Sequence, residues 1–401
     1  MNPLLLRAEV QEFLRSREKQ DPGALALQKS PFPGISPAEL ATQLDSRQRS
    51  KYKLSSWYHS EGIYYPKRLS IEQSSSESTA FHKASLLPPG LRILDLTGGF
   101  GVDSFAFAKT AHSVVYCERD KELAAIVEHN AAVMGVQGME CIAGDGLVYL
   151  QECPGDQFDL IYVDPARRQG SRKVFRLEDC EPNMLELLPL LFKKSPEVMV
   201  KLAPMMDIRE AIRNLSGLYE VQVVSVGGEC KELLCRISRP KEKEKLNPVI
   251  LTATAISSSN KAAKKLLSFS LQEEQQAEVQ FGPPQQYLYE PDAALLKAGA
   301  FRFSADHYGL HKLHLNTHLY TGDTMIEDFM GKITLIISVM PYADFKKLKP
   351  TPSGNVIVRN FPLKADEIRK KHRISESKDH NLYFCTDMEE KLVVIQTIPT
   401  P

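Results

Sequence analysis

The chain has 401 residues, which is too long for one ordinary hydrophobic core and predicts two or three domains. Lys plus Arg and Asp plus Glu number 50 each, so the formal net charge is zero. A global electrostatic attraction to nucleic acid or to an acidic membrane is therefore excluded, and any such partner would need a local basic patch. The seven cysteines form no C-x-x-C pair, and we expect a reduced, cytoplasmic protein. No apolar run is long enough to span a membrane.

Residues 1–68 are predicted to form a small helical region. Apolar residues recur at helical spacing from Leu4 to about Ser56, apart from a Pro-rich break at residues 30–34. Ser36 followed by Pro37 is typical of a helix N-terminus, because the serine side chain can cap the helix and proline suits its first turn.

Residues 69–256 are predicted to form a doubly wound α/β domain with a Rossmann-like parallel sheet. Short continuous apolar runs alternate with helical segments between Leu91 and Arg239, as expected for strands covered on both faces. The charged segment 239–245 is interpreted as a surface loop, and residues 249–256 are expected to return to the sheet.

The remainder is predicted to be a smaller α+β part, after a polar stretch at residues 257–280. It alternates short strand-like and helix-like segments, which we divide into modules at residues 275–328 and 329–401. No tandem repeat is evident.

A glycine-rich turn follows the first predicted strand of the α/β domain. The strand ends at Asp95, and the turn contains Gly98, Gly99 and Gly101 before the next helix. Glycine lets a ligand approach the backbone closely. The spacing matches neither the G-x-G-x-x-G dinucleotide pattern nor a P-loop, so it indicates a different ligand.

Acidic residues also end the next three strands, at Glu118, Asp145 and Asp164. Carboxyl ends of parallel strands meet at one edge of a sheet, where ligands bind in open α/β folds. Glu118 lies roughly twenty residues after the turn, where it can accept hydrogen bonds from a ribose, and Asp145 could accept from an adenine amine. Any one of these acids could instead only cap the following helix, but the ordered set favours a binding site.

A basic segment follows the fourth strand. Asp164 and Pro165 lead into Arg167, Arg168, Arg172 and Lys173, with Phe175 nearby. Arginine can stack on a base or bind phosphate, so this segment is compatible with a nucleotide substrate or with another anion. Lys201 and residues 204–207, at the end of the fifth strand, could also line the substrate pocket. Cys230 lies in a glycine-containing loop and could have a chemical role. Cys235, in contrast, has the sequence context of a core residue.

These motifs closely resemble those of the class I S-adenosylmethionine-dependent methyltransferases. The resemblance implies that Asp95, Gly99 and Gly101 line the amino-acid end of the cofactor, that Glu118 binds its ribose, and that Asp145 meets its adenine. Thr97 stands where that family commonly has its first glycine. The full predicted cofactor set also contains Thr79, Thr97, Gly98, Arg119 and Gly146.

In amino-methyltransferases, an Asp or Asn followed by two prolines and an aromatic residue holds the acceptor amine. Here the corresponding segment is Asp164-Pro165-Ala166-Arg167. We therefore predict catalytic roles for Asp164, Pro165 and Arg167, and substrate contacts for the basic residues Arg167, Arg168, Arg172 and Lys173. We expect no metal.

The combination also resembles a bacterial group of these enzymes that carries a ferredoxin-like module and a THUMP-like C-terminal domain. The resemblance rests on residues 72–79, 95–103 and 164–168 and on tail segments 287–301, 315–322 and 365–374. True THUMP domains bind RNA, so the resemblance implies a methyltransferase acting on a base in tRNA or rRNA. We expect a monomer. A protein or small-molecule acceptor, or a non-catalytic RNA-binding protein on a methyltransferase scaffold, remain as alternatives.

Overall fold

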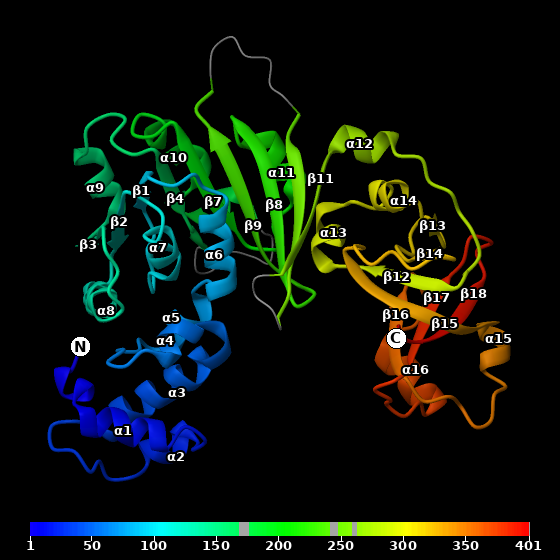
Figure 1. Cartoon of the computed structure of the whole chain (residues 1–401), viewed down its shortest axis with the longest axis horizontal. Helices are drawn as coiled ribbons and strands as arrows, with labels where there is room; N and C mark the ends of the chain where they lie inside the picture. Colours follow the sequence, from blue (N-terminus) through cyan, green and yellow to red (C-terminus); the bar gives the residue numbers. More distant parts are fainter. Residues whose placement is uncertain (168–175, 241–247, 259–262, 401) are drawn as a thin grey trace. The chain divides into compact units, whose positions relative to one another are not determined.

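The computed structural model describes residues 1–167, 176–240, 248–258 and 263–400 (Figure 1). The chain divides into two compact units, Met1–Leu218 with Leu234–Lys245, and Tyr219–Leu233 with Leu246–Pro401. Among the described residues, no helix has both the length and the apolar character needed to cross a membrane.

The first unit begins with short helices, as predicted. Ser36 caps the longest of them, where its side chain accepts from the Glu39 amide and Glu39 returns the contact to the Ser36 backbone. Pro37 occupies the first turn, so the start signal in the sequence is confirmed. The elements are η1 (Pro3–Leu6), α1 (Ala8–Ser16), α2 (Pro22–Ala26), α3 (Pro37–Lys53), α4 (Ser55–His59), α5 (Arg68–Gln73) and α6 (Glu77–Ser85).

These helices share a hydrophobic core with the sheet that follows them. The ring of Trp57 lies 4.9 Å from that of Phe105 and 6.3 Å from that of Phe100, measured between centroids. The Asn130 side chain makes two hydrogen bonds of 2.9 Å with the backbone N–H and C=O of Tyr64. The helical region therefore supports the face of the sheet on which the site is built.

The sheet of the first unit is parallel, with the strand order β7-β4-β1-β2-β3. The chain runs outward from β1 to β3 and then returns to β4 on the other side of β1, so the order reverses between β1 and β4. Ligands of open α/β sheets bind at this reversal, outside the carboxyl ends of the strands. The strands are β1 (Arg92–Asp95), β2 (Ser113–Glu118), β3 (Met139–Ala143), β4 (Leu160–Val163) and β7 (Glu197–Leu202).

Helices connect these strands, which confirms the predicted doubly wound α/β fold. A short antiparallel pair follows β4, in which Ala166 pairs with Glu181 and Arg167 with Cys180. The connecting elements are α7 (Val102–Phe107), α8 (Lys121–Val133), α9 (Gly146–Glu152), β5 (Ala166–Arg167), η2 (Leu177–Asp179), β6 (Cys180–Glu181), α10 (Met184–Leu191) and α11 (Ile208–Asn214).

The second unit opens with strands in the order β11-β10-β8. β10 pairs in parallel with β8, so residues 249–256 do return to a sheet as expected. The polar stretch after them contains an unexpected strand, β11, which pairs antiparallel with β10 and buries Leu267 and Phe269. The elements are β8 (Leu218–Val226), β9 (Glu229–Ser238), β10 (Ile250–Ile256), β11 (Lys264–Ser270) and α12 (Leu271–Gln276).

A seven-stranded sheet completes the second unit, in the order β13-β14-β12-β15-β18-β17-β16. The alternation of short strands and helices predicted for this part of the chain is confirmed. The elements are β12 (Tyr287–Pro291), α13 (Ala293–Ala298), α14 (Phe303–Tyr308), β13 (His311–Lys312), β14 (Tyr320–Gly322), β15 (Gly331–Pro341), α15 (Tyr342–Phe345), β16 (Asn355–Arg359), α16 (Ala365–His372), β17 (Asn381–Thr386) and β18 (Leu392–Pro399).

Trp57→Ala should lower the free energy of unfolding by about 3–5 kcal/mol, because it empties the contact between the N-terminal helices and the sheet. Trp57 is 3 % exposed, whereas Tyr52 on the neighbouring α3 is 83 % exposed. Tyr52→Ala is therefore the matched control and should change stability by less than about 0.5 kcal/mol. Urea unfolding followed by circular dichroism measures both. Equal effects would show that the helices do not support the sheet through Trp57.

Candidate active site

Five polar side chains lie in spatial order along the carboxyl edge of the parallel sheet. Because the strands are parallel and adjacent, the order from β7 to β3 is Lys201, Asp164, Asp95, Glu118 and Asp145. The predicted convergence of Asp95, Glu118, Asp145 and Asp164 on one edge is therefore confirmed. The sequence order of these residues does not reveal that Asp95 and Asp164 are neighbours; the reversal of the sheet makes them so.

The glycine-rich turn needs glycine for two different reasons. A Cβ on Gly98 would lie 2.0 Å from the ring of Tyr116, so the turn passes too close to β2 for any side chain. Gly99 and Gly101 have φ of 54° and 74°, a left-handed conformation that favours glycine. The Tyr116 hydroxyl donates to the Gly99 carbonyl at 2.6 Å and fixes the turn.

Glu118 is oriented by two backbone amides. Gly99 N–H donates to its Oε2 at 2.9 Å, and Asp120 N–H donates to its Oε1 at 2.8 Å. The cap of the next helix is Asp120 and not Glu118, so helix capping does not explain the acid at this strand end. The carboxylate keeps lone pairs that can accept from a ligand.

Asp145 caps a helix and also forms an ion pair. Its Oδ1 accepts from Leu147 N–H at 2.8 Å, and its Oδ2 lies 3.0 Å from Arg119. Arg119 also approaches Glu181, at 3.4 Å. One oxygen of Asp145 therefore caps α9, and the other pairs with Arg119 on the cavity side.

Thr97 and Lys201 hold Asp164 from two sides. Asp164 N–H donates to Thr97 Oγ1 at 2.6 Å, which joins the glycine-rich turn to the end of β4. Lys201, from β7, forms a hydrogen-bonded ion pair with Asp164 Oδ2. The Asp164 side chain is 33 % exposed, and the residue lines the cavity described below.

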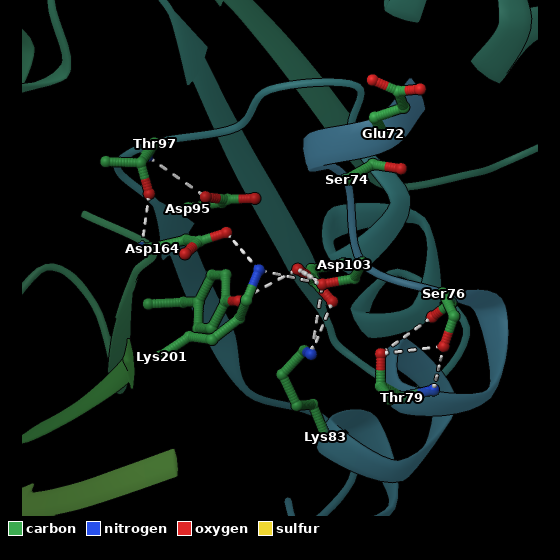
Figure 2. Close-up of polar contacts among 12 residues, drawn as sticks. Glu72, Ser74, Ser76, Thr79, Lys83, Asp95, Thr97, Asp103, Asp164 and Lys201 are labelled. Atoms are coloured by element: carbon green, nitrogen blue, oxygen red, sulfur yellow. Dashed lines mark hydrogen bonds and ion pairs between the residues drawn. The ribbon is translucent and has the colours of Figure 1, made fainter. Parts of the chain in front are cut away.

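Asp103, on α7, is the centre of a buried charge cluster (Figure 2). Its Oδ2 accepts from Ser75 Oγ at 2.7 Å and from Tyr162 OH at 2.9 Å, and its Oδ1 lies 3.2 Å from Lys83 Nζ. The Ser75 hydroxyl also accepts from the ammonium groups of Lys83 and Lys201, each at 3.3 Å. One serine before α6 therefore connects a fully buried lysine to the ion pair of Asp164.

The three carboxyl groups of this cluster have different pKa values. Although burial opposes it, Lys83 and Lys201 lower the pKa of Asp103 below its ordinary value. Burial raises the pKa of Asp164, an effect that Lys201 partly offsets. Asp95 accepts from Ser104 Oγ at 2.5 Å and from Thr97 N–H at 3.2 Å, and burial raises its pKa to about 7.

These side chains surround a cavity of about 630 Å³, which is large enough for a nucleoside-sized ligand. Its lining extends along the edge of the sheet from Asp164, after β4, to Asp145, after β3. Of the predicted cofactor residues, the following line it: Asp95, Thr97, Gly98, Gly99, Gly101, Glu118, Arg119 and Asp145.

The whole chain is similar to one solved structure, described as a candidate methyltransferase from Porphyromonas gingivalis W83. The two share 30 % sequence identity with a TM-score of 0.87, and the match covers 98 % of each chain. The chain belongs to the class I S-adenosylmethionine-dependent methyltransferases of the group with a ferredoxin-like module and a THUMP-like domain. S-adenosylmethionine is the cofactor of this methyltransferase.

Further comparisons agree with that assignment. Uncharacterised S-adenosylmethionine-dependent methyltransferases of two Mycobacterium tuberculosis strains are 24 % identical to it over 316 residues, or 77 % of this chain and 80 % of theirs. Family models match at residues 78–212 (conserved hypothetical protein 95), 287–329 (ferredoxin-like domain) and 331–398 (THUMP domain-like).

Two predicted cofactor residues of the methyltransferase lie outside the cavity lining. Thr79 is 1 % exposed and belongs to the cap of α6, where it exchanges hydrogen bonds with Ser76 (Figure 2). Gly146 starts α9 beside the turn, and a Cβ there would lie 2.6 Å from the Leu96 carbonyl. Their direct contacts with the cofactor stay predictions, while the observed geometry gives both a role in building the site.

The basic segment after β4 lies mostly beyond what the structure describes. Pro165 is half-buried between β4 and β5, and the backbone of Arg167 belongs to β5. The Arg167 side chain, Arg168, Arg172 and Lys173 lie outside the described residues, so their predicted roles stay predictions.

Sequence reasoning assigned no role to Lys83, Asp103 or Tyr162. The available signal was weak: Asp103 follows the glycine-rich turn, and Lys83 lies in the last turn of the short helix α6. A buried lysine almost always has a carboxylate partner, but burial itself is not visible in the sequence.

Cys230 does not have the properties of a nucleophile. Burial raises the pKa of its thiol to about 11, so little thiolate forms near neutral pH. Cys235 is fully buried in β9, as its apolar neighbours indicated.

Glu118→Ala should weaken binding of S-adenosylmethionine by roughly 1–3 kcal/mol, through lost charge-assisted hydrogen bonds. Glu118→Gln should weaken it less, because the amide keeps one acceptor for the backbone. Isothermal titration calorimetry measures both variants. Glu128→Gln, on the exposed face of α8, is the control that removes a carboxylate away from the cavity. Unchanged affinity in Glu118→Ala would refute the ribose assignment.

Proposed function

We propose that this methyltransferase methylates a base in structured RNA, either tRNA or rRNA. The main observation in favour of this proposal is that the second unit combines a ferredoxin-like segment with a THUMP-like segment. The ferredoxin-like and THUMP-like segments share one sheet, because β12 of the former pairs with β15 of the latter along residues 287–291 and 331–335. True THUMP domains bind RNA, and here the THUMP-like segment has a continuous, hydrogen-bonded junction with its neighbour.

The proposed cofactor contacts follow the order of the strand ends. Glu118 accepts hydrogen bonds from the ribose hydroxyls, and Asp145 accepts from the adenine amine, with Arg119 beside it. The turn from Asp95 to Gly101 lines the amino-acid end. The fit is supported by the preset orientation of Glu118 and by the open space above Gly99, where a Cβ would meet nothing closer than 3.9 Å.

The acceptor lies at the Asp164 end of the cavity in this proposal. The cofactor supplies an electrophilic methyl group, so the protein has to align the acceptor and remove one proton. Asp164 accepts the hydrogen bond of the acceptor group, and the Pro165 backbone helps to position it. Thr97 and Lys201 fix the carboxylate in place, which limits the number of orientations that the acceptor can adopt.

The basic residues supply the remaining substrate contacts. We propose that Arg167, Arg168, Arg172 and Lys173 contact the phosphates and the base next to the active site. The last turn of α16 is also basic, with Arg369, Lys370 and Lys371, and Lys370 and Lys371 can reach phosphates from the second unit.

The direct test is to incubate the protein with methyl-labelled S-adenosylmethionine and total RNA, with a protein extract and with a small-molecule extract in parallel. Label should enter RNA and resist protease. Asp164→Asn should reduce the rate about a hundredfold or more, whereas Glu152→Gln, exposed at the end of α9, should leave it unchanged. Label found only in protein or in small molecules would contradict the RNA acceptor, and failure to bind the cofactor would contradict any methyl transfer.

The affinity for RNA should fall as the salt concentration rises, because bound phosphates release counterions. Replacing one phosphate-contacting arginine, as in Arg172→Gln, should flatten the slope of log affinity against log salt by about one unit. Fluorescence anisotropy with labelled tRNA at several salt concentrations measures the slope. An affinity that does not depend on salt would remove the proposed phosphate role of the basic residues.

A further inference from the structure

Among the residues that the structure describes, the buried charge cluster beside the cofactor cavity has one positive charge fewer than it has carboxylates. It contains the carboxyl groups of Asp95, Asp103 and Asp164 and the ammonium groups of Lys83 and Lys201 (Figure 2). Three negative and two positive charges leave a net charge of minus one when every group is ionised. An uncompensated charge in a buried site is costly, so the site will bind either a proton or a cation.

Asp95 is the carboxylate of the cluster that has no ammonium partner among the described residues. Asp103 contacts Lys83, and Asp164 contacts Lys201, so each of these acids has its own ammonium partner. Asp95 is 1 % exposed, and in the described part of the chain its hydrogen-bond partners are a hydroxyl and an amide. Burial and the nearby carboxylates together raise its pKa to about 7, so Asp95 is partly protonated at neutral pH.

Several elements contribute the groups that surround Asp95. The β2 side contributes Tyr116 and Cys117, both kept neutral because burial raises their pKa values. Glu118, at the end of the same strand, is engaged by two amides and faces the other half of the cavity. The remaining polar groups are these: Thr97 in the turn, Ser104 and Asp103 on α7, Tyr162 and Asp164 on and after β4, Lys201 on β7, and Ser75 and Lys83 before and on α6.

The charge of the cofactor matches this shortage. S-adenosylmethionine has a sulfonium, an ammonium and a carboxylate, which sum to one net positive charge, whereas S-adenosylhomocysteine has a neutral sulfur and no net charge. We propose that the charge cluster exchanges one proton for the positive charge of S-adenosylmethionine, and later takes up the proton that the methyl acceptor loses. The summed charge of the cluster and its bound ligand would thus stay near zero with either ligand.

Asp164 is the entry point for the proton of the acceptor. Its side chain is 33 % exposed, whereas those of Asp103 and Lys83 are 10 % and 0 % exposed. Methyl transfer would break the bond between sulfur and the methyl carbon and form a bond between the acceptor and that carbon. The bond between the acceptor and its hydrogen would break, and an O–H bond would form on Asp164. The cluster, again one positive charge short, holds that proton until a new S-adenosylmethionine replaces the product. No other reactant is required.

Because of this exchange, the affinities for S-adenosylmethionine and S-adenosylhomocysteine should depend differently on pH. Below the pKa of about 7 at Asp95, S-adenosylmethionine must displace a proton, so its affinity should rise with pH by up to about tenfold per unit and level off above neutrality. S-adenosylhomocysteine displaces no proton, so its affinity should change little over the same range. The inference does not depend on an RNA acceptor.

Calorimetric titration in two buffers of different ionisation enthalpy, phosphate and Tris, counts the protons. Wild-type protein at pH 7 should release about half a proton per S-adenosylmethionine, and more at pH 6. It should release almost none with S-adenosylhomocysteine. Both ligands carry the same amino group, with a pKa of about 8, so comparing them largely removes its contribution. Equal heats in both buffers, or equal proton release with the two ligands, would overturn the proposal.

Variants locate the titrating group. Asp95→Asn should abolish the proton release and lower the preference for S-adenosylmethionine over S-adenosylhomocysteine by about tenfold, since it removes a charge rather than only a contact. Asp145→Asn is the matched control at the adenine end, and it should weaken both ligands equally and preserve the proton release. If Asp95→Asn does not fold, Asp164→Asn provides the same comparison. Release that persists in both cluster variants would overturn the proposal.

Discussion

The need to compensate buried charge governs the architecture of this methyltransferase. Asp103 and Lys83 lie inside the protein, where an isolated ion would be strongly destabilising, and they are stable only because they are close to each other and to Ser75 and Tyr162. These groups come from α6 and the segment just before it, from α7 and from β4. The cluster therefore joins the segment before the sheet to the sheet itself, and it sets the positions of Lys201 and Asp164 at the end of the cavity where we place the acceptor.

The same compensation links structure to chemistry. A site with rigid carboxylates and one missing positive charge favours a cationic ligand without any large conformational change. At the other end of the cavity, Glu118 is held by Gly99 and Asp120, so its orientation does not depend on the cofactor. The cavity thus combines a charge-balanced end and a hydrogen-bonding end, and a molecule with a sulfonium and a ribose meets both requirements.

The second unit shows how a sheet can unite two small modules. The ferredoxin-like segment ends at residue 329 and the THUMP-like segment begins at residue 331, yet their strands β12 and β15 are paired neighbours. Each module alone has few strands. In the shared sheet, β12 of one module and β15 of the other cover each other's edge. An RNA contacting one module would consequently meet a surface whose backbone is fixed by the other.

The sequence by itself determined the parallel sheet, the glycine-rich turn and the acids at four strand ends, because apolar periodicity and strand-end chemistry are local properties. It also led to the methyltransferase family. It could not reveal that Lys83 and Asp103 are partners, that Ser75 joins them to Lys201, or that Thr97 contacts Asp164, since these residues are 20 to 126 positions apart. Such pairs form only when the sheet reverses its strand order and α6 packs beside it. Charge balance is a property of that packing, and tertiary structure alone decided it.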